Sequence, residues 1–180
     1  MTLSERQEWI LGGSLVLGGL ALYIQSSKHP LIKPTKVVYP PKNGGSPNNR
    51  IYQIIRDPSE LDPLLVTKAP LLLNFVRLGE PASSKLTISL QKIVSTDMVK
   101  ENKAVSMVSV ECDGTENIPL AVKYAIKEIP SILCLDKQLP AGNYVDLDLN
   151  RDPQNTEVKV EQLTQWVREH AKDITDDQHN

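Results

Sequence analysis

Hydrophobic residues after position 50 alternate between short apolar runs and stripes with helical spacing. Residues 71–76 form a continuous apolar run, which is typical of a strand buried on both faces of a sheet. Residues 83–99 instead carry apolar side chains at the spacing of one helical face. The residues on this face are Leu86, Leu90, Ile93 and Val94.

The alternating pattern predicts strands and helices that follow one another along the chain. Strands are expected at residues 51–55, 71–76, 104–110, 131–135 and 144–149. Helices are expected at residues 57–69, 83–99, 118–127 and 158–171. In the helix expected at residues 118–127, the side chains of Ala121, Val122 and Ala125 are expected to face the core. This order predicts an α/β fold in which a mixed central sheet is flanked by helices.

The apolar stretch at residues 9–24 differs from these runs because it is uncharged and apolar on all sides. As a helix it would span roughly 24 Å at about 1.5 Å per residue, slightly short of a hydrocarbon core of about 30 Å. We interpret residues 9–25 as a single transmembrane anchor that follows a short tail at residues 1–8. Two alternatives are a cleaved secretory signal and a buried core helix. Glu5 and Glu8 disfavour the signal, and the four glycines disfavour the core helix.

Residues 26–50 are rich in proline and lysine, and we predict an unpacked linker there. The first 50 residues carry a net charge of +4, whereas the remainder carries −6, which together give the −2 of the whole chain. Basic flanks stay on the side from which a segment inserts. We therefore expect a mitochondrial membrane, with the outer membrane and a body facing the cytosol favoured. The endoplasmic reticulum membrane is the alternative.

Composition narrows the chemistry that the chain can carry. The sequence of 180 residues is 40% hydrophobic, enough for a packed core, and its near-neutral charge argues against nucleic-acid binding. Cys112 and Cys134 are too few for a disulfide framework or a closed zinc site. Asp146 and Asp148 lack the spacing of a calcium loop, and we place them on a solvent-facing edge strand. No metal or cofactor is expected.

The segment Lys123–Ile132, with the sequence KYAIKEIPSI, resembles the thioredoxin superfamily. The expected strand at residues 71–76 is similar to the central strand of that family, and the helix around Trp166 to its last helix. The resemblance covers residues 51–172 and leaves a polar tail at residues 173–180. It implies a thioredoxin-like fold in which a cis Ile129–Pro130 bond opens a strand beside the active site.

The chain departs from this family where the redox motif belongs. Residues 79–84 read GEPASS and contain no cysteine, and Glu80 and Ser83 stand at the positions of the two thiols. Without thiols the family's disulfide exchange is unavailable. We interpret Ser83 as a helix cap and Glu80 as a partner of the helix dipole, and we expect no catalytic residue.

The two cysteines do not replace the missing pair in this scheme. The resemblance puts their strands on opposite sides of the central strand, about 10 Å apart, beyond the reach of a disulfide. Both are expected to be small buried hydrophobic residues. The alternative is a thiol-dependent redox protein that uses Cys112 or Cys134.

Family members without cysteines often keep the groove beside the cis-proline for binding peptides, and the resemblance implies such a groove here. Its lining residues would be Gly79, Glu80, Pro81, Ala82, Ser83, Ile129 and Pro130. The alternative is that the proline is a relic that only defines the fold. We expect a non-enzymatic module that is tethered to a membrane through residues 9–25 and binds or helps assemble another protein.

Overall fold

The computed structural model describes residues 36–174. The described residues all lie in one compact unit of the chain, residues 35–180. The predicted tail at residues 1–8 and anchor at 9–25 lie outside the described residues. No helix within residues 36–174 has the length and apolar character that crossing a bilayer requires.

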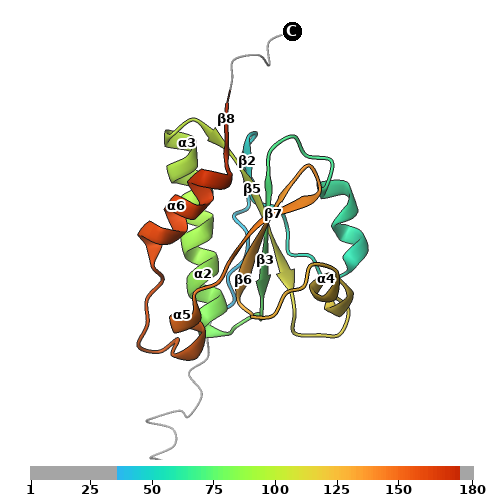
Figure 1. Ribbon diagram of the computed structural model, residues 1–180, viewed down its shortest axis with the longest axis vertical. Helices are drawn as coiled ribbons and strands as arrows, with labels where there is room; N and C mark the ends of the chain where they lie inside the picture. Colours follow the sequence, from blue (N-terminus) through green and yellow to red (C-terminus); the bar gives the residue numbers. More distant parts are fainter. Residues whose placement is uncertain (1–35, 175–180) are drawn as a thin grey trace, which may run out of the picture. The chain divides into compact units, whose positions relative to one another are not determined.

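A four-stranded sheet with the order β5-β3-β6-β7 forms the centre of the body (Figure 1). The central strand β3 (Leu71–Val76) runs parallel to β5 (Ser106–Glu111) and antiparallel to β6 (Ser131–Asp136). The edge strand β7 (Leu139–Tyr144) forms an antiparallel hairpin with β6. The predicted mixed sheet is confirmed, and every residue of β3 is buried as expected.

The predicted strand at residues 51–55 is an extended segment with two isolated bridges instead of a regular strand. Ile51 and Ile55 pair in parallel with Met107 and Val110 of β5. The amide of Ile55 donates to the carbonyl of Ser109 at 2.8 Å, so the segment still covers the outer edge of β5.

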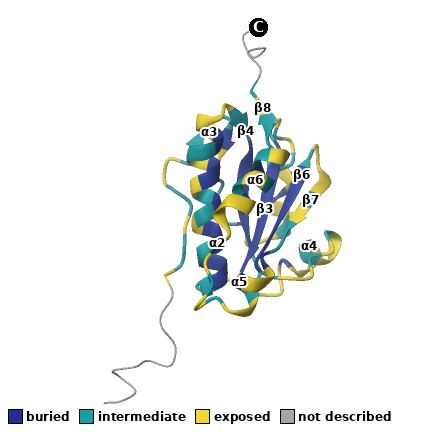
Figure 2. Cartoon of the chain, turned by 60° about the vertical axis from the view of Figure 1, so that its left-hand side comes forward, coloured by how far each residue is buried: buried dark blue, intermediate teal, exposed yellow. Residues whose placement is uncertain are grey.

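One face of the sheet is covered by two long helices. Helix α2 (Pro81–Lys92) continues through a π-helical turn, η3 (Ile93–Asp97), into α3 (Met98–Lys100), and α6 (Val160–His170) lies beside it. The whole predicted apolar stripe of α2 is buried, as the dark blue inner side of the helix shows (Figure 2). The predicted pattern of this helix is therefore confirmed.

The other face is covered by shorter elements. In place of the predicted helix at residues 57–69 there are two 3₁₀ turns, η1 (Pro58–Glu60) and η2 (Asp62–Leu64), because a proline occupies the start of each. Helix α4 (Ile118–Lys123) stops before the predicted end, since Ala125 has a φ of 52°.

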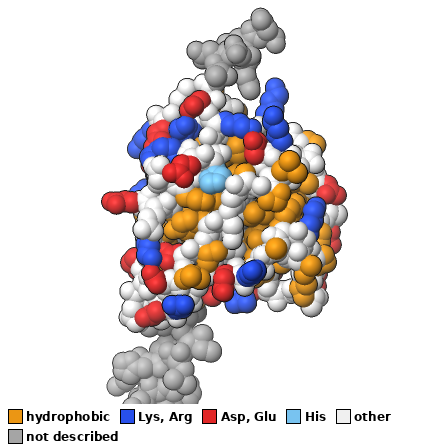
Figure 3. Space-filling view, in the orientation of Figure 1, with side chains coloured by type: hydrophobic (Ala, Val, Ile, Leu, Met, Phe, Trp, Pro, Cys, Tyr) orange, Lys and Arg blue, Asp and Glu red, His pale blue; other side chains and the backbone are white. Residues whose placement is uncertain are grey.

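The inward side of α4 was also predicted wrongly. Val122 is 72% exposed, and Leu120 is the residue that enters the core. Hydrophobic side chains gather on the visible surface over the part of the body that contains α4 and the β6–β7 hairpin (Figure 3).

The predicted linker at residues 26–50 is packed in its described part, so the body begins before residue 51. Strands β1 (Gly45–Ser46) and β2 (Asn49–Arg50) form a small hairpin. Asn49 is buried, and its amide donates to the carbonyl of Lys103 at 2.7 Å. The turn needs glycine at position 45, where φ is 82° and a Cβ would lie 2.3 Å from a carbonyl oxygen.

The predicted strand at residues 144–149 is wrong. The hairpin turns earlier, at Lys137 and Gln138, both of which have positive φ, and residues Leu147–Arg151 form helix α5. Asp146 starts this helix because its carboxylate accepts a hydrogen bond from the amide of Leu149 at 3.2 Å. Asp146 is therefore a buried helix cap and does not face solvent on an edge strand.

The far end of the chain is tied to the body by a second short pair of strands. β8 (Lys172–Asp173) pairs with β4 (Lys103–Ala104), and Arg168 of α6 makes two contacts of 2.6 Å with the carboxylate of Glu101. Asp173 of the predicted polar tail is thus part of a strand, while residues 175–180 lie outside the described residues.

Candidate functional site

Two segments that are far apart in the sequence meet at the carboxyl end of β3. Phe75 pairs with Ser131 across the β3–β6 ladder, so the chain leaves β3 next to the point where Pro130 enters β6. The Ile129–Pro130 peptide bond is cis, as the resemblance implied. The turn between β3 and α2 and the loop before β6 therefore lie at the same end of the sheet, where β3 ends and β6 begins.

The turn between β3 and α2 is held by hydrogen bonds within itself. The amide of Arg77 donates to Ser83 Oγ at 3.1 Å, the Ser83 hydroxyl donates to the Glu80 carboxylate, and the amide of Glu80 donates to the Arg77 carbonyl at 3.3 Å. Gly79 permits this path because its φ is 78°. The two side chains at the expected thiol positions thus bond to each other.

The interpretation of Ser83 as a helix cap is wrong. Glu80 is the N-cap residue of α2, Pro81 is the first helical residue, and Ser83 lies in the first turn. Its hydroxyl points back to the turn before the helix, where it accepts a hydrogen bond from the amide of Arg77. Ser83 consequently closes the turn and does not cap the helix.

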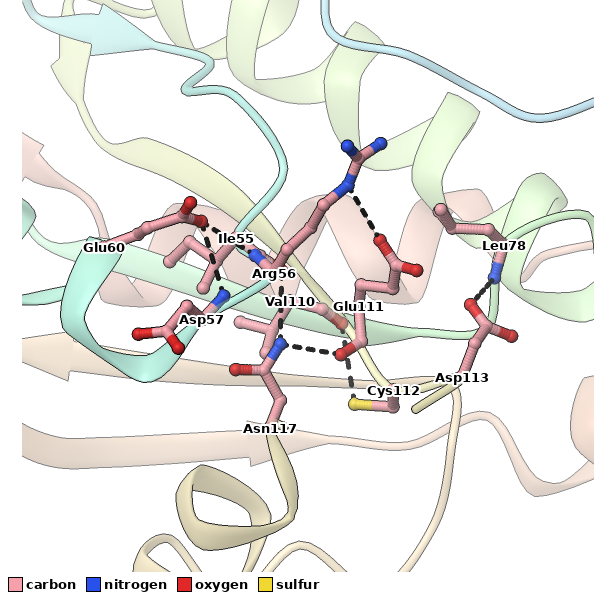
Figure 4. Close-up of polar contacts among 10 residues, drawn as sticks. All are labelled: Ile55, Arg56, Asp57, Glu60, Leu78, Val110, Glu111, Cys112, Asp113 and Asn117. Atoms are coloured by element: carbon pink, nitrogen blue, oxygen red, sulfur yellow. Dashed lines mark hydrogen bonds and ion pairs between the residues drawn. The ribbon is translucent and has the colours of Figure 1, made fainter. Parts of the chain in front are cut away.

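The loop that follows β5 supports the same turn from one side (Figure 4). The carboxylate of Asp113 accepts from the amide of Leu78 at 2.7 Å, and the amide of Cys112 donates to the carbonyl of Val76 at 2.8 Å. At the end of this loop, the buried Asn117 donates to the carbonyls of Glu111 and Ile55 at 2.8 and 3.2 Å. The turn is therefore tied by hydrogen bonds to the loop that follows β5.

One polar residue beneath the turn, Asn74, was not predicted to belong to the site. Asn74 lies in the middle of β3 and is fully buried, and its amide donates to the Thr87 hydroxyl at 2.9 Å and the Ser109 hydroxyl at 3.2 Å. These contacts join β3 to α2 and β5. A lone asparagine within an apolar run is the signal that points to it, since a buried amide needs partners.

The predicted groove residues divide into two groups by exposure. Ala82, Ser83 and Pro130 are buried, whereas the other four are half-buried: Gly79, Glu80, Pro81 and Ile129. Gly79 and Ser83 also line a cavity of about 10 Å³ with Thr87, Ser109 and Val38. A space of this size holds about one water molecule. Any larger ligand that binds at this end of the sheet would therefore lie on the surface.

The two cysteines lie on opposite sides of β3, as expected, but only Cys134 is buried: the prediction of a buried Cys112 is wrong, because Cys112 follows the end of β5 and is partly exposed. Cys112 follows β5, Cys134 is within β6, and both are free thiols. Burial raises the pKa of Cys112 to about 11 and that of Cys134 to about 12. Because the thiolate is the reactive form, both thiols are weak nucleophiles at neutral pH.

No group of three or more histidine, cysteine, aspartate or glutamate side chains is arranged to hold a metal ion within residues 36–174. The two aspartates that suggested calcium have other partners. Asp146 caps α5, and Asp148 pairs with Lys159 Nζ at 2.6 Å, a hydrogen bond that lowers the pKa of Asp148.

No family model and no curated protein matches this chain. Several solved structures, however, are similar to this chain in fold. A mutant thioredoxin from Halobacterium salinarum is 13% identical, with a TM-score of 0.54 over 73% of this chain and 100% of that protein. Thioredoxin F from spinach chloroplast is 14% identical, with a TM-score of 0.51 over 68% of this chain and 88% of the other. Thioredoxin O2 from Arabidopsis thaliana, in its oxidized state, is 13% identical, with a TM-score of 0.50 over 71% and 99%.

These similarities, together with the strand order and the cis-proline, define the class of the protein by its fold. The body is a mixed α/β domain with a thioredoxin-like sheet flanked by helices. At 13–14% identity the similarity concerns the fold alone.

Proposed function

We propose that this chain is a membrane-tethered, thioredoxin-like module that binds or helps assemble another protein and does not exchange thiols. The observation that carries the proposal is the turn between β3 and α2, where Glu80 and Ser83 bond to each other at the expected thiol positions. A carboxylate and a hydroxyl cannot form or break a disulfide.

The raised pKa values of the two cysteines argue against the alternative, a redox protein that uses one of them. Of the two thiols, Cys112 is the stronger candidate for a redox role, because it lies next to the turn and is only partly buried. Burial raises the pKa of the Cys112 thiol to about 11, so roughly a hundredfold less thiolate is present at neutral pH than for an ordinary cysteine.

The backbone before Pro130 supports a binding role. Among residues 36–174, no backbone hydrogen bond engages the amide or carbonyl of Ile129, whereas the Pro130 carbonyl accepts from the Asn150 side chain at 3.2 Å. A half-buried residue with free backbone groups can pair with an extended ligand, as in strand addition. Gly79, Glu80 and Pro81 would form the opposite side of this surface.

A photo-crosslinking amino acid at position 129 tests the binding role in intact cells. We expect a discrete adduct with one protein, while the same group at Val122, on the exposed side of α4, gives none. Identical adducts at both positions would contradict a groove-specific partner. The identity of the adduct would name the partner.

The tether and its membrane belong to the same proposal and rest on the sequence. We place residues 9–25 in the mitochondrial outer membrane with the body facing the cytosol, and the endoplasmic reticulum is the alternative. Alkaline carbonate should leave the intact chain in the membrane pellet, and protease added to intact mitochondria should remove the body. Release by carbonate would contradict the tether, and protection from protease would contradict the orientation.

A further inference from the structure

The first described residues lie against the body as an ordered strap, which we define as residues 36–42. The strap runs alongside α2 (Figure 2). The side-chain amide of Gln91 donates to the carbonyl of Tyr39 at 3.3 Å, and Val38 lines the small cavity at the end of β3 together with Ser84 and Thr87. The strap is therefore part of the folded surface.

Apolar side chains are exposed side by side where the strap meets α2. Tyr39 is 62% exposed and Ile88 is 56% exposed. With Lys36, Val37 and Val38 they line an open groove of about 390 Å³. We call these residues, together with Lys92, the strap face. Contiguous exposed apolar groups of this kind mark interaction sites more often than solitary ones do.

The charge of this region indicates the chemistry of the partner. The strap itself contains two cationic side chains, Lys36 and Lys42, and no acidic one, although the chain as a whole is net negative. Lys92 adds a further exposed cation one helical turn after Ile88, on the same side of α2.

Tyrosine, an aliphatic side chain and lysines around an open groove suit the headgroup region of a bilayer. The tyrosine ring and the lysine stems are apolar while their tips are polar, so they can lie at the boundary between headgroups and acyl chains. The ammonium groups are attracted by anionic lipids. A purely hydrophobic partner would leave Lys36 and Lys92 without compensation.

We propose that the strap face docks onto the surface of an anionic membrane. This contact is additional to the proposed tether and does not depend on it, because all its residues belong to the folded body. It is a reversible surface contact, governed by lipid charge and weakened by salt.

An environment-sensitive fluorophore tests the proposal in the full chain. The fluorophore NBD is attached to Ile88→Cys in a Cys112→Ser background, since Cys134 is fully buried. The protein is reconstituted with phosphatidylcholine vesicles that contain or lack phosphatidylserine. We expect a blue shift of emission that requires phosphatidylserine and disappears at high salt. The matched control, NBD at Val122→Cys, should not respond.

Charge-neutralising variants sharpen the test. Lys36→Gln and Lys92→Gln should each weaken the phosphatidylserine-dependent response by about fivefold, whereas Lys123→Gln and Lys127→Gln on the other side of the sheet should not. Equal emission at position 88 in both lipids would overturn the proposal. A shift that appears without lipid and grows with protein concentration would also overturn it, by assigning the face to a second copy of the chain.

The same sample separates this proposal from the tether. Flotation of the vesicles at alkaline pH reports whether the chain is inserted, independently of the fluorophore. A chain that floats while NBD at position 88 ignores phosphatidylserine refutes docking alone. A chain that is released at alkaline pH but responds to phosphatidylserine at neutral pH supports docking and refutes the tether.

Discussion

The two sides of the candidate groove differ in how their backbone groups are satisfied. On the turn side, the amides of Arg77, Leu78 and Glu80 all donate to groups of the protein itself. On the loop side, Ile129 has no backbone hydrogen-bond partner among the residues that the structure describes. The backbone donors of the turn are thus satisfied within the protein, whereas the backbone groups of Ile129 are not.

This difference separates two properties that a thioredoxin-like site combines. Thiol chemistry needs cysteines at the start of the helix, and this chain has Glu80 and Ser83 at the start of α2. Recognition of an extended chain needs free backbone groups, and Ile129 has them. Under the proposed function, binding depends on the backbone at Ile129 and does not require thiols at the start of α2.

The largest effect is expected from restoring thiols on the turn side. Glu80→Cys combined with Ser83→Cys places a Cys-x-x-Cys pair at the start of α2, where the helix dipole lowers a thiol pKa to about 7. We expect this double variant to reduce insulin in the presence of dithiothreitol.

The control for that gain is Glu80→Ala combined with Ser83→Ala, which breaks the same hydrogen bonds without adding thiols and should stay inactive. A folded double-cysteine variant without activity would show that the turn does not correspond to the redox motif.

The native thiol next to the turn should react slowly. Because burial raises the pKa of Cys112 to about 11, its alkylation by iodoacetamide should be about a hundredfold slower at neutral pH than in the urea-unfolded chain. Between pH 7 and 10 the rate in the folded protein should rise about tenfold per pH unit, since the thiolate fraction rises with pH. Rapid alkylation at neutral pH would favour the thiol-dependent alternative.

Removing the support beneath the turn should reduce stability. Asn74→Ala leaves the hydroxyls of Thr87 and Ser109 without their buried partner and should lower the free energy of unfolding by about 2 kcal/mol in urea titration. Asn143→Ala, at an exposed position of β7, should change it by less than about 0.5 kcal/mol. Equal losses in the two variants would mean that Asn74 is not part of the support.

A smaller effect is expected from opening the turn itself. Ser83→Ala removes the acceptor of the Arg77 amide and the donor to the Glu80 carboxylate, so about 1 kcal/mol of stability should be lost. The neighbouring Ser84→Ala is the matched control, because no hydrogen bond of its hydroxyl to another described residue would be lost. If both variants unfold at the same urea concentration, Ser83 does not close the turn.

Long periodic elements were predictable from the sequence because their pattern is set by burial. The stripe from Leu86 to Val94 and the central run at residues 71–76 were placed correctly. The cis Ile129–Pro130 bond followed from a local motif. In each case the information lies within about ten consecutive residues.

Short elements were not predictable in this way, since single positions decide them. Positive φ at Lys137 and Gln138 moves the hairpin, and the cap at Asp146 turns the expected strand into a helix. The packed linker depends on Asn49 and a carbonyl 54 residues away. For the candidate site, the motif predicted the cis bond at Ile129–Pro130, but the mutual bond of Glu80 and Ser83 and the contacts of Asn74 depend on the three-dimensional structure.

Insulin reduction by the unmodified full chain shows directly whether this protein carries out thiol chemistry. We expect a rate equal to that of dithiothreitol alone, unchanged by Cys112→Ser or Cys134→Ser, because neither thiol is paired or activated. Turnover above that background which either substitution abolishes would contradict a thioredoxin-like module without thiol chemistry.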